Sequence, residues 1–245
     1  MSLVITLYLR EGIVMASDSR LTLNAQQQQP NNTIVNLAVG QSDSNYKTFL
    51  ASNNVGISTY GAADIQGVPI AGYIESFFAE CLTQATDSVE DVARNLSAYF
   101  RRFQPVPDTQ FHVAGYTSVG GTSEQQVWHV AVAADQVSRL SPTGQQGASW
   151  GGEADILSRL LLPVALVNQQ GQVQQQLSHF QIPWQFFTLQ DAIDFAVFAI
   201  RSTIDAIRFQ PRPKTVGGPI DVLVIKPTEA FWVQRKALRG APHAG

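Results

Sequence analysis

The sequence predicts an α+β fold, a four-layer αββα sandwich in which two antiparallel sheets lie between two pairs of helices. The first observation is the order of periodic segments: strands, two helices, strands, two helices, strands. This order segregates the two element types instead of alternating them. The second is the length of 245 residues, near the upper end of what one hydrophobic core fills. The third is an apolar fraction of 44%, ordinary for a globular protein. We therefore expect residues 1–245 to form a single domain.

The N-terminal part predicts two β-hairpins separated by an insertion. Their apolar strands flank short turns that contain Gly, Ser or Asn, and they are Leu3–Leu9 with Ile13–Ser17, and Lys47–Ala51 with Val55–Tyr60. Between the hairpins, Asn24–Ser44 is a polar tract with neither a helical nor a strand period. We expect this tract to be an inserted surface loop.

Two helices and a set of short strands follow. A helix is predicted within Ala62–Cys81, at least from Pro69 onward, because proline is best tolerated in a first helical turn. Ser88 and Asp91 have the spacing of a capping box, and apolar residues continue at helical spacing to Phe103. The strands predicted next are Phe111–Tyr116, Gln126–Ala133, Val137–Leu140 and Ala148–Trp150.

The C-terminal part predicts a second pair of helices and two last strands. The helices are Glu153–Val167 and Leu189–Phe209, and Thr188 with Asp191 caps the second one. The strands are Ile220–Ile225 and Ala230–Val233. Residues 238–245 are expected to be a flexible tail.

Composition argues against several kinds of partner. The chain has 16 Lys and Arg against 19 Asp and Glu, a net charge of −3, so it lacks the basic excess that nucleic acid binding requires. The single cysteine rules out an intramolecular disulfide, and with only four histidines the composition argues against a Cys/His zinc site; we expect no metal and no cofactor. No apolar run approaches the ~18 residues that span a bilayer, and no signal peptide is apparent. We expect a cytoplasmic protein without membrane contact.

One short motif suggests a serine hydrolase. Gly147-Ala148-Ser149-Trp150-Gly151 matches the G-x-S-x-G pattern, in which a sharp strand-to-helix turn exposes a nucleophilic serine. A catalytic histidine downstream would be His179 or His243. However, the polar segment Thr143–Gln146 precedes the motif where a buried parallel strand is required. A serine esterase that uses Ser149 therefore stays an alternative.

A second pattern, spread over most of the chain, favours a different interpretation. It comprises four segments in a fixed order: Ser2–Ile5, Gly12–Thr22, Val55–Asp64 and Gly217–Val222. Together they resemble proteasome β-subunits and their bacterial relatives, in the N-terminal-nucleophile hydrolase superfamily. The resemblance runs nearly end to end, and it implies the αββα fold, a peptide or amide substrate and a homo-oligomer.

The resemblance also implies roles for four residues. The family nucleophile falls on Ser2, whose α-amine would act as the base once Met1 is removed. Asp18, sixteen residues further on, would pair with Lys47, which lies fourteen residues before Gly61. A buried Lys47 ammonium would favour the ionised nucleophile. The Gly61 N–H would stabilise the oxyanion.

The same resemblance implies substrate-binding residues. Thr22 and Ala63 would line an extended peptide, and Leu21 and Thr59 would border the specificity pocket. The chain departs from the family just before Gly217, where Arg212–Val216 replaces an acidic residue and a serine, and at Gly151-Gly152-Glu153, which replaces Gly-Ser-Gly. Candidates to substitute are Thr215, Ser149 and Glu153. A catalytically inactive scaffold or interaction subunit of the same fold is therefore a second interpretation.

Overall fold

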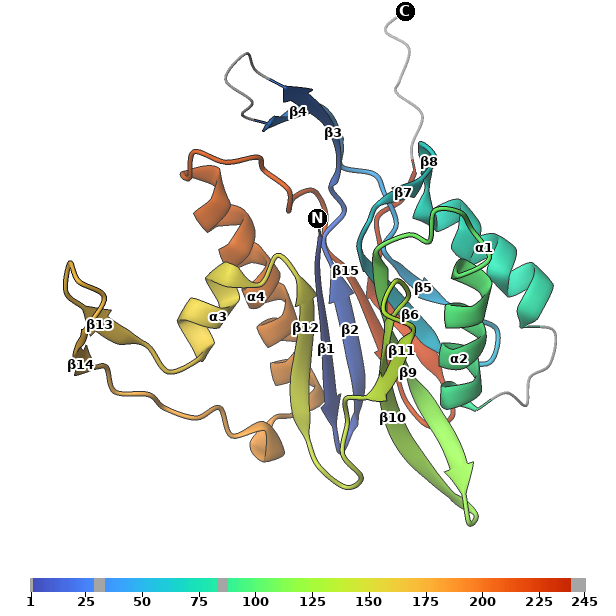
Figure 1. Ribbon diagram of the computed structural model, residues 1–245. Coiled ribbons are helices and arrows are strands. Elements are labelled where there is room, and N and C mark those ends of the chain that lie inside the picture. The colour runs from blue at the N-terminus through green and yellow to red at the C-terminus, as the bar shows by residue number, and fades with distance from the viewer. Residues whose placement is uncertain (1, 29–33, 83–87, 239–245) are drawn as a thin grey trace, which may run out of the picture.

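The computed structural model describes residues 2–28, 34–82 and 88–238. This part of the chain contains four α-helices and two five-stranded antiparallel sheets, with three small two-stranded sheets beside them (Figure 1). The predicted combination of antiparallel sheets with helices is therefore confirmed. Met1 and all but the first residue of the expected tail, together with the tip of the expected insertion loop, lie outside the described residues.

The first sheet contains the N-terminal strand as one of its inner strands. Its strands, in spatial order, are β12 (Gly147–Gly152), β1 (Leu3–Leu9), β2 (Gly12–Ser17), β15 (Asp221–Ile225) and β16 (Ala230–Gln234). Every residue of β1, β2 and β15 is buried, as expected of strands that are covered on both faces. Helix α4 (Leu189–Arg208) packs against β1 and β2, and α3 (Asp155–Leu161) packs against α4.

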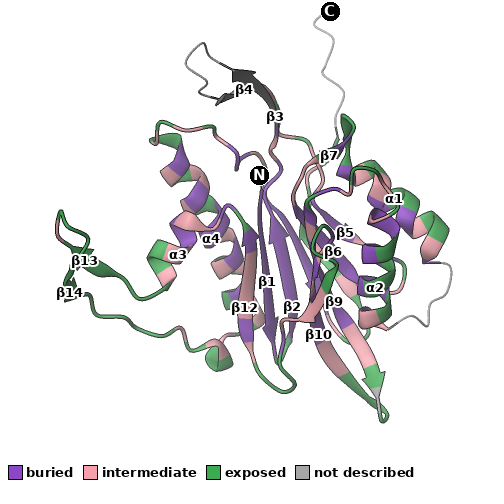
Figure 2. Cartoon of the chain, viewed as in Figure 1, coloured by how far each residue is buried: buried purple, intermediate pink, exposed green. Residues whose placement is uncertain are grey.

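The second sheet faces the first. Its strands are β11 (Gln136–Arg139), β10 (Thr122–Ala131), β9 (Thr109–Val119), β6 (Gly56–Gly61) and β5 (Thr48–Leu50). Helix α2 (Val89–Phe100) packs against β9 and β10, while α1 (Ile70–Cys81) contacts α2. Strand β6 contacts β1, β2 and β12 of the first sheet. The buried residues accordingly concentrate on the strands between the two sets of helices (Figure 2).

The helix caps agree with the sequence, but one helix is shorter than predicted. Capping boxes are present at Ser88 for α2 and at Thr188 for α4. The prediction of a helix over Glu153–Val167 is wrong, because α3 ends at Leu161. Leu162 precedes a proline and adopts an extended conformation, which the proline ring favours. None of the described helices has both the length and the apolar character needed to cross a membrane.

The Asn24–Ser44 tract is not a loop without regular structure, as was predicted. Strands β3 (Leu21–Gln28) and β4 (Ile34–Ser42) pair as an antiparallel hairpin that extends from the end of the two large sheets (Figure 1). Two further hairpins were not predicted. One is β7 (Asp64–Ile65) with β8 (Val68–Pro69), and the other is β13 (Ala165–Val167) with β14 (Val173–Gln176), followed by the short helix η1 (Trp184–Phe186).

The interface between the two sheets contains a buried histidine. His112 of β9 is 1% exposed, and its Nδ1 forms a 3.0 Å hydrogen bond with Thr6 Oγ1 of β1. The Tyr60 ring meets His112 edge-on at 5.5 Å between ring centroids. Burial lowers the pKa of His112 from 6.5 to about 3, and the nearby His129 contributes in the same direction. His112 is therefore a neutral core residue near pH 7.

Acid should weaken the fold through His112. The unfolded chain binds a proton there near pH 6.5, whereas the folded chain does so only near pH 3, so stability is lost as the pH falls between these values. This residue should contribute about 1.4 kcal/mol per pH unit to the slope. Urea unfolding between pH 4 and 8 should show a smaller slope for His112→Gln than for wild type. The exposed His179→Gln should serve as the control, and an equal slope in His112→Gln would contradict the assignment.

Candidate active site

The start of β1 and the end of β2 bring Ser2 close to Asp18. The two strands are antiparallel, with Val4 opposite Ser17, so Leu3 lies beside Asp18. The Leu3 N–H donates to Asp18 Oδ1 at 3.0 Å, and the Asp18 N–H donates to the Leu3 carbonyl at 3.3 Å. Ser2 is 4% exposed. Ser2, the predicted nucleophile, is thus covalently joined to Leu3, whose amide binds Asp18.

The Asp18 carboxylate is fully buried and accepts four hydrogen bonds. Oδ1 accepts from the Leu3 amide and, at 2.7 Å, from the Lys47 ammonium. Oδ2 accepts from the amides of Arg20 and Gly217, each at 3.0 Å. A buried carboxylate is tolerated only when it is paired and hydrogen-bonded in this way. The predicted Asp18–Lys47 pair is therefore present in the structure.

Lys47 lies just before β5 and is one of the largest fully buried side chains, with 1% of the residue exposed. Its carbonyl accepts a hydrogen bond from the Thr59 amide at 2.8 Å, which fixes its backbone against β6. Burial lowers the pKa of the Lys47 ammonium below its usual 10.5, while the charge and hydrogen bond of Asp18 oppose this shift. Because Leu3 N and Lys47 Nζ bind the same Asp18 oxygen, the ammonium lies close to the Ser2–Leu3 peptide bond.

The Gly61 N–H points toward the edge of β6 beside which Lys47 lies. The Tyr60 carbonyl accepts a hydrogen bond from Thr109 Oγ1 of β9 at 3.3 Å. In a trans peptide the C=O and the following N–H point in opposite directions, so the Gly61 N–H points away from β9. Strand β5 pairs with β6 only over Gly56–Ser58, and none of the described strands pairs with Gly61 on that edge. This orientation suits a donor to a substrate oxygen.

A second group of charges flanks Ser2 on the β12 side. The Glu153 amide donates to the Ser2 carbonyl at 2.7 Å. The Glu153 carboxylate in turn accepts from Arg212 Nη1 at 2.7 Å and from Thr215 Oγ1 at 2.9 Å, and Arg212 also pairs with Asp155. Two of the three candidates to substitute for missing family residues, Glu153 and Thr215, therefore contact each other next to Ser2.

The four predicted substrate-binding residues differ in their burial and in their hydrogen bonds. Thr22 is 8% exposed, and its Oγ1 is buried without a hydrogen-bond partner among the described residues. Thr59 is also buried, with its hydroxyl 3.3 Å from Thr109 Oγ1. Leu21 is half-buried at the start of β3, and the Ala63 carbonyl accepts from the Ile70 amide at the start of α1. Of these four, Thr22 alone presents an unengaged buried hydroxyl.

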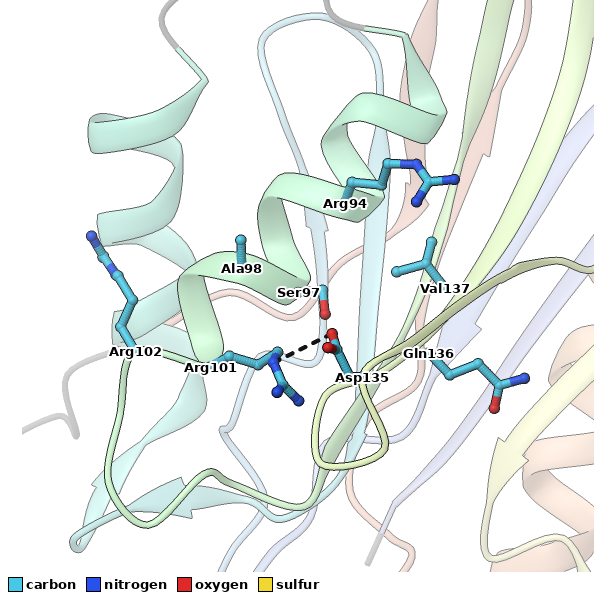
Figure 3. Close-up of a pocket in the computed structure, with 8 residues that line it drawn as sticks. All are labelled: Arg94, Ser97, Ala98, Arg101, Arg102, Asp135, Gln136 and Val137. Atoms are coloured by element: carbon cyan, nitrogen blue, oxygen red, sulfur yellow. Dashed lines mark ion pairs between the residues drawn. The ribbon is translucent and has the colours of Figure 1, made fainter.

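A pocket of about 610 Å³ lies elsewhere in the fold and was not predicted. Figure 3 shows it between α2 and the β10–β11 turn. Its arginines are each paired with a carboxylate: Arg94 with Glu90, Arg101 with Asp135 and Arg102 with Glu80. None of its lining residues was predicted as a site residue. The described residues include no cluster of three or more His, Cys, Asp or Glu that could hold a metal ion.

Ser149 does not have the geometry of a nucleophile elbow. It lies in the middle of β12, opposite Thr6 of the antiparallel strand β1, and not at a strand-to-helix turn. The glycines of the motif have a packing role instead. A Cβ on Gly147 would collide with the Tyr8 ring, and one on Gly151 would collide with the Tyr60 ring. The serine esterase alternative therefore loses its structural basis.

Comparison with solved structures shows a related fold. Anbu from Hyphomicrobium sp. strain MC1 has a TM-score of 0.55 and 14% identity, over 96% of this chain and 88% of that one. A second structure, an Anbu Gly-1 mutant from the same strain, has a TM-score of 0.56 and 15% identity, over 91% of this chain and 81% of that one. The fold is thus proteasome-like.

These comparisons correct the family assignment made from sequence. Neither a scan against protein-family models nor a search of curated proteins gives a match, so membership of the proteasome β-subunit-like family, in its bacterial branch, is not supported. The similarity is to Anbu, and identities of 14% and 15% establish a shared fold alone. The four short segments that carried the sequence-based assignment lie on β1, β2, β6 and β15, so they reflect the shared fold and do not establish a family.

Replacing Gly152 by alanine should disturb the Ser2 segment. Gly152 has φ +94°, and a Cβ there would collide with the Ser2 carbonyl oxygen. Gly171→Ala is the matched control, because Gly171 has φ +76° and open space around it. In thermal unfolding, both variants should lose about 1–2 kcal/mol of stability through backbone strain. Gly152→Ala should lose a further ~1–3 kcal/mol through the collision with Ser2. Equal destabilisation would contradict the close contact.

Proposed function

We propose that the chain is an N-terminal-nucleophile hydrolase that cleaves a peptide or amide bond with Ser2. The observation that carries the proposal is the buried Asp18–Lys47 pair, which shares Asp18 Oδ1 with the amide next to Ser2. A buried ion pair is weak support for stability, since its desolvation cost is high. Titratable groups whose pKa values are shifted by burial and by a charged partner cluster at functional sites. The proteasome-like fold supports the same conclusion.

The chemistry begins with loss of Met1, which frees the α-amine of Ser2. The Ser2 hydroxyl attacks the substrate carbonyl, and the amine accepts the hydroxyl proton. The positive charge of Lys47 stabilises the alkoxide as it develops, while the Gly61 N–H donates to the oxyanion. The amine then protonates the leaving nitrogen, which gives an ester on Ser2. Water, deprotonated by the same amine, hydrolyses this ester and restores the site.

Asp18 fixes the geometry of this reaction. Three of its four hydrogen bonds come from backbone amides, so the carboxylate is held independently of Lys47. A carboxylate that cannot move holds the ammonium at one distance from Ser2, which is the preorganisation that electrostatic catalysis requires. We assign Asp18 as a positioning residue and Lys47 as the electrostatic partner of the nucleophile.

We also propose that the two sheets and their helices form one αββα domain. Support comes from the contacts of α4 with β1 and β2, of α2 with β9 and β10, and of β6 with the first sheet. The site lies where the ends of both sheets meet, so Ser2 and Lys47 come from different sheets of this domain.

A homo-oligomer is the assembly we propose. The segment 160–190, which includes the β13–β14 hairpin, contains no Asp, Glu, Lys or Arg. Its β13–β14 hairpin projects from the rest of the chain (Figure 1), and the segment exposes large apolar side chains: Leu166, Val167, Val173, Phe180 and Phe186. An apolar, uncharged projection is typical of a surface that contacts another protein, and the proposed partner is a second copy of this chain.

Covalent labelling tests the nucleophile directly. A peptide epoxyketone reacts with the hydroxyl and the amine of an N-terminal serine together, so intact mass should show chain without Met1 carrying one probe on Ser2. Ser2→Ala should not react, whereas Ser149→Ala should react normally. Lys47→Met should react at least about 10²-fold more slowly, since it removes the charge that stabilises the alkoxide.

Two controls separate chemistry from folding and from the alternatives. The double variant Lys47→Met/Asp18→Asn leaves no unpaired buried charge, so it should fold and yet react slowly. Labelling that depends on Ser149 would instead support a serine esterase. Retained Met1 in the natural host, with no labelling, would support the inactive scaffold.

Light scattering tests the assembly. At micromolar concentration the wild-type protein should be larger than 26.7 kDa. Leu166→Glu with Val173→Glu should give monomer, because a charge buried without a partner is costly. Phe209→Glu, which alters an exposed apolar residue outside this segment, is the control. A wild-type particle of monomer size would rule out the proposed assembly.

A further inference from the structure

Two of the four lysines in the chain are buried near each other. Besides Lys47, the side chain of Lys236 is only 6% exposed, and its ammonium pairs with the fully buried Asp221 carboxylate. The Lys236 amide also donates to Asp221 Oδ1 at 2.8 Å. Asp221 therefore holds both the backbone and the side chain of Lys236, just beyond β16.

This second pair is adjacent to the first. Asp221 begins β15 and lies opposite Ser17, the residue before Asp18. The Lys236 ammonium is 4.4 Å from the centroid of the Tyr46 ring, and the Tyr46 hydroxyl donates to the Lys236 carbonyl at 3.3 Å. Tyr46 precedes Lys47 in the chain. Asp221 and Lys236 thus contact the neighbours of both members of the Asp18–Lys47 pair.

Neighbouring charges act on the pKa values of the two lysines in both directions. Lys47 is influenced by Asp18 and Asp43, which favour its charged form, and by Lys236, which disfavours it. For Lys236, Asp221 and Asp18 favour the charged form, whereas Arg235 disfavours it. Burial lowers the pKa of both ammonium groups, and it is the largest cause in each case.

We propose that Lys236 and Asp221 form a positioning pair for the Ser2 site. They hold the Tyr46–Lys47 segment in place through contacts from the chain after β16. The positive charge of the Lys236 ammonium also makes the Lys47 ammonium easier to deprotonate. The link to hydrolysis rests on the proposed function: if the reaction needs the charged form of Lys47, Lys236 sets the upper limit of the active pH range. The residues of this pair give no sequence signal, since Lys236 lies beyond the last predicted strand.

Titration of Lys47 tests the proposal without any substrate. With four lysines, ¹³C-labelled lysine gives resolvable side-chain signals in NMR. In Lys236→Met the titration midpoint of Lys47 should rise by about one pH unit or more, because a repelling charge is lost and Asp221 is left unpaired. Lys236→Arg should restore the wild-type midpoint. Lys226→Met, at the other end of the β15–β16 hairpin and ion-paired with Glu229, should leave it unchanged.

A double variant keeps the test valid if Lys236→Met does not fold. Lys236→Met/Asp221→Asn removes both charges and should still raise the Lys47 midpoint, by a smaller amount. An unchanged midpoint in these variants would overturn the proposal. If the midpoint shifts but Ser2 never reacts with the epoxyketone, the coupling holds and the proposed function fails. If both hold, the alkaline limit of labelling should rise with the Lys47 midpoint.

Discussion

The Asp18 carboxylate is the group on which the candidate site depends. It joins four segments that are distant in sequence: the start of β1 through Leu3, the turn after β2 through Arg20, the start of β5 through Lys47 and the segment before β15 through Gly217. Three of these donors are backbone amides, so the arrangement is set by the course of the chain. Lys47 supplies the ammonium that pairs with this buried carboxylate.

Gly217 lies where these segments approach each other closely. The Arg20 guanidinium lies against Gly217 so closely that any side chain there would collide with it. Arg20 is held in that position by two hydrogen bonds of 2.7 Å to the Asp43 carboxylate. The Asp18–Lys47 pair therefore sits within a larger set of charges, which includes Arg20 with Asp43 and Lys236 with Asp221. Burying the Asp18–Lys47 and Asp221–Lys236 pairs has a high desolvation cost, and charges of this kind cluster at functional sites.

Sequence reasoning chose residues that the structure brings together, but not the residues that surround them. Ser2, Asp18, Lys47 and Gly61 could be chosen because their spacing resembled a family pattern, and the first three do lie together. Lys236 and Asp221 could not be chosen, since their pairing depends on the register of β15 and on the path of the chain after β16. Long-range contacts of this kind leave no local pattern.

The same limit applies to the fold. The caps of α2 and α4 could be predicted, because a capping box involves residues only three apart. The β3–β4 hairpin could not, since its strands lack the regular alternation of apolar and polar residues that burial of one face produces. Helix α3 was extended too far because the apolar residues of the projecting segment continued its pattern past Pro163. These residues are exposed in the single chain, so their apolar character reflects a different requirement from core packing.

The distance between Ser2 Oγ and Lys47 Nζ in the processed protein tests the central claim most directly. A crystal structure of the chain that begins at Ser2 would measure it, with Asp18 as the internal reference. We expect the two atoms to lie within about 4–6 Å, the range over which a charge shifts the pKa of a neighbouring group. A Lys47 side chain directed away from Ser2, with Asp18 bound by other donors, would contradict the account.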